Sequence, residues 1–215
     1  MENFTIQGLA KELEALQDTA PDPPAAIAQR LQTAIAEYGP QTIIDALEAA
    51  IPEGATIGEM IVYRSGKLTL LYGRAPAHFR SAIHDHTVFA CIAQLTGAET
   101  SVVYEPAEDG NGLRVVETVT GRPGDVTTLP PDAIHHIENP TDDIASALHV
   151  YGGDFGAVAE DRSLWTHDDH ERGGFSFDKL LQQSVLAMKR TGNEPGLQGL
   201  VDAIPAARML IDAVQ

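Results

Sequence analysis

Two histidines separated by one residue, His84 and His86, could do chemistry together in this sequence. Side chains at positions i and i+2 of a β-strand point to the same face, so both imidazoles could bind one metal ion. The pair alone is a weak signal, because a surface or core pair of histidines is the more common outcome. A third ligand is needed before a metal site is indicated.

A second motif, about forty residues further on, supplies that ligand. Gly124, Pro130, His135 and Asn139 form the spacing G-x5-P-x4-H-x3-N. In a β-barrel, this distance returns the chain after a hairpin to a strand that faces the first pair. A third imidazole then closes a facial site with open positions for substrate and oxygen. We therefore predict a mononuclear metal site made by His135 and the first pair.

Short strand-like runs separated by turn residues surround both motifs. They cover residues 59–63, 67–72, 90–95, 100–104, 113–119, 125–129 and 145–151. Many short strands spaced about ten residues apart indicate a β-sandwich or barrel rather than βαβ units. We predict one barrel over residues 56–160.

The two ends of the chain have helical periodicity. Leu9, Leu13 and Leu16 recur at helical spacing near the N-terminus, and residues 1–55 are predicted to form a helical cap. Residues 161–215 are predicted to form a connector and helices that pack on the barrel or against a second subunit, so a homodimer stays open. The three parts are expected to form one structural domain.

Composition limits the classes of partner. The net charge of −17 disfavours nucleic acid, since it repels phosphate. The longest apolar runs are too short to span a bilayer, and residues 1–4 lack the basic and apolar regions of a signal peptide. The single cysteine, Cys91, agrees with a reducing compartment. We expect a cytoplasmic protein that acts on a small molecule, with no membrane partner.

The two histidine motifs resemble those of the cupin superfamily. That resemblance implies a mainly β fold, the double-stranded β-helix or jelly-roll barrel, with a metal ion inside. Many cupins carry a glutamate four or five residues after the H-x-H pair, but Ala90 and Cys91 stand there in this sequence. The departure removes the carboxylate and leaves a three-histidine site.

Within the cupins, the sequence resembles the cysteine dioxygenase-like thiol dioxygenases, and residues 149–155 also resemble a bacterial branch described as predicted metal-dependent cupins. The resemblance implies that His149 and Tyr151 flank the metal as catalytic residues without ligating it. It also places Cys91 where some members carry a cysteine cross-linked to a tyrosine. The family's serine, two positions before His149, is Ala147 here.

Imidazole ligands suit Fe, Zn, Cu and Ni about equally, so the ligands alone do not choose the metal. The resemblance implies Fe(II), which would add O2 to the sulfur of a small thiol, such as cysteine or a mercapto-carboxylate, to give a sulfinate. With three neutral ligands the ion keeps its full charge, which favours deprotonation of a coordinating thiol.

A substrate carboxylate would need a cationic partner, and an arginine is the natural one. We predict that Arg64 binds it, because Arg64 lies where the thiol dioxygenases tend to carry theirs. Arg80 is the alternative, since it shares strand parity with the first histidine pair. The alternative for each arginine is a surface charge.

Two other functions stay open. The same three-histidine site could belong to a dioxygenase that cleaves a carbon–carbon bond in a non-thiol substrate. It could also belong to a non-enzymatic cupin that binds a metal or a small ligand. Oxygen consumption with a panel of thiols separates the three hypotheses.

Overall fold

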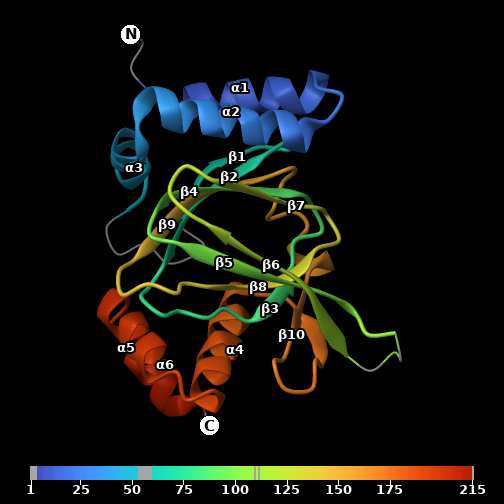
Figure 1. Ribbon diagram of the computed structural model, residues 1–215, viewed down its shortest axis with the longest axis vertical. Helices are drawn as coiled ribbons and strands as arrows, with labels where there is room; N and C mark the ends of the chain where they lie inside the picture. The colour runs from blue at the N-terminus through green and yellow to red at the C-terminus, as the bar shows by residue number, and fades with distance from the viewer. Residues whose placement is uncertain (1–3, 53–59, 109, 111, 215) are drawn as a thin grey trace.

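The computed structural model describes residues 4–52, 60–108, 110 and 112–214. The predicted boundary at residues 55 and 56 and the start of the strand predicted over 59–63 lie outside these residues. Figure 1 shows a β-barrel between two groups of helices, one from each end of the chain. None of the helices in the described ranges has the length and apolar character needed to cross a membrane.

Three N-terminal helices form a layer over one side of the barrel (Figure 1). They are α1 (Ile6–Thr19), α2 (Pro23–Tyr38) and α3 (Pro40–Glu48). The side chain of Thr5 caps α1 and that of Asp22 caps α2, in each case by accepting a hydrogen bond from a first-turn amide. The predicted apolar positions Leu9 and Leu13 are buried, and the helices share one hydrophobic core with the nearest sheet.

That nearest sheet is antiparallel, with the strand order β1-β2-β9-β4-β7. Its strands are β1 (Ile61–Arg64), β2 (Thr69–Ala75), β4 (Ala90–Thr96), β7 (Val126–Leu129) and β9 (Ala145–Tyr151). Successive side chains alternate between its two faces. Leu70, Cys91 and Val150 therefore face the helical layer, whereas Leu71, Ala90 and Tyr151 face the barrel interior.

The opposite sheet has the order β11-β10-β3-β8-β5-β6 and is also antiparallel. Its strands are β3 (Ile83–Asp85), β5 (Glu99–Pro106), β6 (Leu113–Gly121), β8 (Ile134–Glu138), β10 (Ser163–Trp165) and β11 (Arg172–Gly174). Strands β10 and β11 lie in the segment that we predicted as a connector without strands. The two facing sheets, with helices on both sides, confirm the predicted mainly β, double-stranded β-helix fold.

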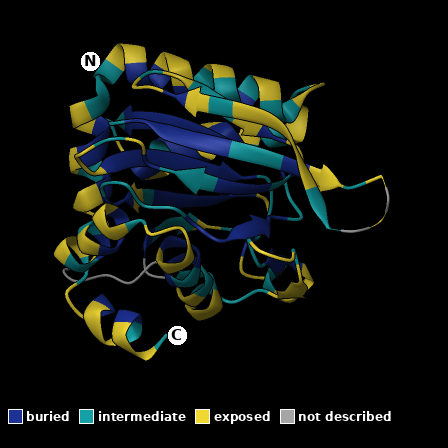
Figure 2. Ribbon diagram, turned by 60° about the horizontal axis from the view of Figure 1, so that its bottom comes forward, coloured by how far each residue is buried: buried dark blue, intermediate teal, exposed yellow. Residues whose placement is uncertain are grey.

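Three C-terminal helices cover the other side of the barrel. They are α4 (Phe177–Arg190), α5 (Glu194–Ala203) and α6 (Ala207–Ala213), and they share a small hydrophobic core. The amide of Ala82 donates a hydrogen bond of 2.9 Å to the Ser184 hydroxyl of α4, which fastens this helix to the start of β3. Figure 2 shows buried strands between helices whose outer faces are exposed.

Candidate metal centre

The two strands that carry the predicted metal ligands are direct neighbours. His84 on β3 lies opposite His135 on β8 in the antiparallel register, and His86 follows β3 immediately. The three side chains are between 1% and 8% exposed. One nitrogen from each lies within 4.8 Å of the others, so the structure brings the predicted ligands together in a group that could hold a metal ion.

The three imidazoles are neutral. Burial is the main cause that lowers the pKa of His84 to about 3 and the pKa values of His86 and His135 well below their ordinary range. His84 Nδ1 lies 3.0 Å from the Ala82 carbonyl, so Nδ1 carries the proton and the Nε2 lone pair is free to bind. The Nε2 atoms of His86 and His135 approach to 3.3 Å. Three convergent neutral nitrogens fit a divalent metal ion such as Fe, Zn, Cu or Ni.

His149 and Tyr151 lie next to this group on β9. The Tyr151 hydroxyl is 3.4 Å from His149 Nδ1, and the rings of Tyr151 and His86 are 5.0 Å apart. Burial lowers the pKa of His149 to about 4 and raises that of Tyr151, so both side chains are neutral at pH 7. Gly73 makes room for His149, because a Cβ atom there would lie 2.5 Å from its Nε2.

A buried arginine that our sequence analysis did not identify also reaches this region. Arg162, 3% exposed, donates from Nε to the Asp85 carbonyl at 3.0 Å. Its guanidinium carbon lies 3.9 Å from the Phe155 ring centroid and 3.5 Å from that of Phe175. Its Nη1 is buried and has no hydrogen-bond partner among the described residues. A short strand, β10, follows Arg162 and pairs with the ligand strand β3.

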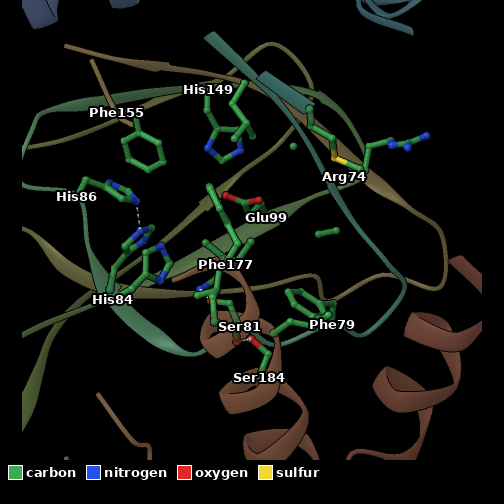
Figure 3. A pocket seen from close by; sticks show the side chains of 18 of the residues that line it. Arg74, Phe79, Ser81, His84, His86, Glu99, His149, Phe155, Phe177 and Ser184 are labelled. Carbon is green, nitrogen blue, oxygen red and sulfur yellow. Dashed lines mark hydrogen bonds between the residues drawn. The ribbon is translucent and has the colours of Figure 1, made fainter. Parts of the chain in front are cut away.

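These side chains line a cavity of about 130 Å³ inside the barrel (Figure 3). Most of its wall is apolar, and helix α4 closes one side with Phe177, Leu180 and Leu181. The polar groups that line it are His84, His86, His135, His149, Tyr151, Arg162, Arg74, Glu99, Ser81 and Ser184. The arrangement can hold a metal ion at one place and a small, partly polar ligand beside it.

No protein-family model matches the chain. An RmlC-like cupin family protein from Methanocaldococcus jannaschii is similar in structure, with 12% identity, a TM-score of 0.37 and coverage of 45% of this chain and 79% of that one. A cupin superfamily protein from Desulfitobacterium hafniense has 14% identity, a TM-score of 0.36 and coverage of 44% and 75%. A double-stranded β-helix protein from Klebsiella pneumoniae has 13% identity, a TM-score of 0.39 and coverage of 50% and 82%. These neighbours are cupin-type proteins, and the likeness to thiol dioxygenases stays a prediction.

The structure corrects the prediction for Cys91. This residue pairs with Val150 across β4 and β9, and both face the helical layer. Its sulfur lies 3.5 Å from the Pro24 carbonyl of α2, and burial raises the pKa of its thiol to about 11. Tyr151 pairs instead with Ala90 and points into the barrel, on the opposite face of the sheet. Cys91 therefore lies outside the cavity, on the opposite face of the sheet from Tyr151.

The structure also corrects the prediction for Arg64. Its side chain is 50% exposed and forms an ion pair with Asp154, with 2.6 Å between Nε and Oδ1. It does not line the cavity. The alternative, Arg80, contacts Glu138 and His167 away from the cavity. Arg162 and Arg74 are the arginines that line the cavity, and of the two Arg162 is buried.

The position of the missing serine is apolar. Ala147 faces the barrel interior, whereas the hydroxyl of its neighbour Ser146 lies 2.7 Å from that of Thr96 on the other face. The hydrogen-bonded pair of His149 and Tyr151 therefore receives no support from a hydroxyl at position 147.

Proposed function

We propose that the protein is a non-haem Fe(II)-dependent thiol dioxygenase that converts a small thiol, such as cysteine or a mercapto-carboxylate, to its sulfinate. Both atoms of O2 enter the product, the sulfur is oxidised by four electrons and O2 is reduced by four, so no further reductant is needed. The observation that carries the proposal is the buried group of three neutral histidines, which opens onto a small cavity that also contains a guanidinium and a tyrosine hydroxyl.

His84, His86 and His135 would hold the iron. When bound, Fe(II) supplies a charge that lowers the pKa of a coordinating thiol, and open positions for the thiolate and O2. No carboxylate belongs to the histidine group in the described part of the chain. The site therefore keeps the whole charge of the ion available to an anionic sulfur.

Arg162 would bind the carboxylate of the substrate. Its orphaned Nη1 is buried, and Phe155 and Phe175 hold the guanidinium plane between their rings. A preorganised guanidinium matches a carboxylate with two parallel hydrogen bonds. Burial lowers the pKa of Arg162 to about 10, which leaves the group protonated at pH 7.

Tyr151 would orient the reacting groups with a hydrogen bond. Burial raises the pKa of its hydroxyl, so the proton stays on Oη at pH 7 and can be donated into the cavity. His149 Nδ1 lies 3.4 Å from that oxygen and helps to fix its direction. Stacking on Phe155, with ring centroids 3.9 Å apart, fixes the ring itself.

The cavity wall would keep water away from the reaction. Phe177, Leu180 and Leu181 of α4 form an apolar part of the cavity wall. Exclusion of water strengthens the interaction of Arg162 with an anion, because the local dielectric constant falls.

Oxygen consumption by the Fe(II)-loaded protein tests the proposal. Cysteine, 3-mercaptopropionate and 2-mercaptoethanol would each be supplied, and sulfinate would be quantified by mass spectrometry. We expect one sulfinate per O2 consumed with at least one thiol, and no reaction in the His135→Ala variant. Absence of thiol-dependent uptake by protein with full iron occupancy would refute the proposal.

Two observations favour a second candidate, a dioxygenase that cleaves a carbon–carbon bond. The cavity is largely apolar, and Ala147 replaces the serine that thiol dioxygenases carry. Uptake of O2 with a diketone, such as acetylacetone, and with no thiol would support it. A protein that binds metal but consumes O2 with neither class would instead be a non-enzymatic cupin.

A further inference from the structure

Glu99 is a charged side chain of the cavity that has no task in the reaction described above. Glu99 is the first residue of β5, is 7% exposed and points into the cavity below the ring of His149 (Figure 3). It is thus more than nine-tenths buried, yet its carboxyl borders the open space rather than the packed core.

Within the described ranges, the Glu99 carboxyl takes part in no side-chain hydrogen bond or ion pair that would offset its burial. Burial is the only cause that acts on its pKa, which rises to about 7. A carboxyl that lies at the wall of a cavity and forms no hydrogen bond with the neighbouring side chains that the structure describes is available to a hydrogen-bond donor or a cation that enters the cavity.

Arg162 does not pair with the Glu99 carboxyl. Its Nε is bound to the Asp85 carbonyl, and its guanidinium lies between two aromatic rings. The charge of Arg162 acts on the three metal-binding histidines, and the charges of Arg162 and Glu99 both act on Tyr151. The cavity therefore has a cationic group near the histidines and an anionic group at Glu99, with Tyr151 within reach of both.

The strand register gives the separation between Glu99 and the metal-binding histidine His135. On β5, Val103 is the residue opposite His135, and Glu99 lies four residues before it on the same face of the strand. Four residues of extended strand span about 13 Å between Cα atoms. The side chains of Glu99 and His135 both extend into the cavity, which shortens the gap between the carboxyl and the imidazole. The remaining gap suits a ligand of a few heavy atoms.

We propose that Glu99 binds the ammonium group of a small ligand whose other end lies at the three histidines. An ammonium supplies the charge and the hydrogen-bond donors that the carboxyl lacks, and a cavity of about 130 Å³ admits a primary amine of few carbons. The identity of the other end as a thiol rests on the proposed function; binding of the amine does not.

Calorimetric titration of the metal-loaded protein without oxygen tests this inference. The probes are 3-aminopropanethiol, its neutral analogue 1-propanethiol, and 3-amino-1-propanol, which keeps the amine but lacks sulfur. The variant Glu99→Gln keeps the shape of the side chain and removes its charge. Glu105→Gln changes an exposed carboxyl on the same strand and serves as the matched control.

We expect the wild type and Glu105→Gln to bind each amine at least tenfold more tightly than Glu99→Gln does, and 1-propanethiol to bind all three proteins equally. Binding of 3-amino-1-propanol at pH 7 should also release about half a proton, because the amine favours ionised Glu99. Buffers of different ionisation enthalpy measure this release. Equal amine affinity of wild type and Glu99→Gln would overturn the inference, as would wild-type preference for 1-propanethiol over 3-aminopropanethiol.

The wild-type comparison of the two thiols decides the question even if Glu99→Gln does not fold. The sulfur-free amine separates the inference from the dioxygenase proposal. Glu99-dependent binding of 3-amino-1-propanol without thiol oxidation would support the inference alone. Thiol oxidation without any preference for amines would overturn it and leave the dioxygenase proposal intact.

Discussion

The guanidinium carbon of Arg162 lies 3.9 Å from the centroid of the Phe155 ring. The ring of Tyr151 also stacks on Phe155, with centroids 3.9 Å apart and an interplanar angle of 14°. The stack holds the cation and the hydroxyl of the cavity in fixed relative positions. The stack joins Phe155, which follows β9, to Tyr151, the last residue of β9. No local sequence pattern indicates this contact.

Replacing Arg162 should weaken the binding of carboxylate-bearing thiols. Arg162→Met removes the charge and keeps much of the side-chain volume, so we expect KM for 3-mercaptopropionate to rise about tenfold or more, since a hydrogen bond to a charged group contributes roughly 1.5–3 kcal/mol. Steady-state kinetics measure this rise. With mercaptoethanol as the substrate, which has no carboxylate, the same substitution should change KM little. Arg64→Met is the control, and a larger effect there would contradict the assignment.

Removal of one ligand should abolish metal binding. His135→Ala takes away one of three nitrogens that lie within 4.8 Å of one another, and we expect the bound metal, measured by inductively coupled plasma mass spectrometry, to fall to background. His136→Ala changes the next residue, whose ring bonds to Tyr104 and Glu138 instead. This control should keep its metal and lose stability. Full metal occupancy in His135→Ala would disprove the ligand set.

Acid should destabilise the metal-free protein. Burial lowers the pKa of His84 to about 3 and that of His149 to about 4, whereas both titrate near pH 6.5 when unfolded. Between these values the unfolded state binds more protons, so the stability that these groups contribute is complete above about pH 6.5 and is lost as pH falls through the folded values. We expect Tm to fall steadily from pH 6.5 to pH 4.

Glu99 has the opposite effect on how stability changes with pH. Its pKa is raised to about 7, so its ionisation disfavours the folded state as pH rises from about 4.5 to 7. Glu99→Gln should therefore show a steeper loss of Tm on acidification, and His149→Gln a shallower one. Scanning calorimetry across this range checks both slopes, and a wild-type Tm that increases from pH 6.5 to pH 4 would contradict the buried neutral state of the histidines.

Cys91 should affect stability and not catalysis. Its side chain is fully buried between β4 and α2, so Cys91→Ala should cost about 1 kcal/mol of the free energy of unfolding. We expect unchanged kcat and KM, and an intact mass equal to the unmodified sequence mass after aerobic turnover. A loss of two hydrogens that disappears in Cys91→Ala would show a cross-link and refute this placement.

The two histidine motifs were predictable because each depends on a short-range rule. Strand parity puts His84 and His86 on one face, and the hairpin between the motifs returns the chain so that His135 lies beside β3. The strands likewise follow from local alternation and turn residues. These are properties of neighbouring residues, which a sequence displays directly.

Cys91 and Arg162 were not predictable in this way. Cys91 was placed by the family resemblance, which does not show on which face of the sheet a residue lies. The backbone turns at Thr87, where φ is 60°, and β4 begins anew at Ala90, so strand parity cannot be carried from His86 to Cys91. Arg162 is placed by the pairing of a three-residue strand with β3, about eighty residues earlier, and its neighbours in the sequence carry no sign of that contact.

Gly73, on the strand β2 that pairs with β9, should be needed to keep the His149 ring in position. A Cβ atom at Gly73 would lie 2.5 Å from His149 Nε2 and 2.9 Å from its Cδ2, closer than such atoms can come. Gly73→Ala should therefore displace the ring and disturb its contact with Tyr151, which is 3.4 Å long. We expect kcat to fall about tenfold or more, because small displacements at a reacting centre are costly.

The metal content of Gly73→Ala should remain normal, since His149 does not belong to the three-histidine group. Gly66→Ala is the matched control, because a Cβ atom there would meet nothing within 4 Å. Equal kcat in Gly73→Ala and Gly66→Ala would show that the position of the His149 ring does not matter for turnover. A fall in kcat together with loss of metal would instead show that the alanine disturbs the barrel as a whole, and would remove the assignment of His149 as a positioning residue.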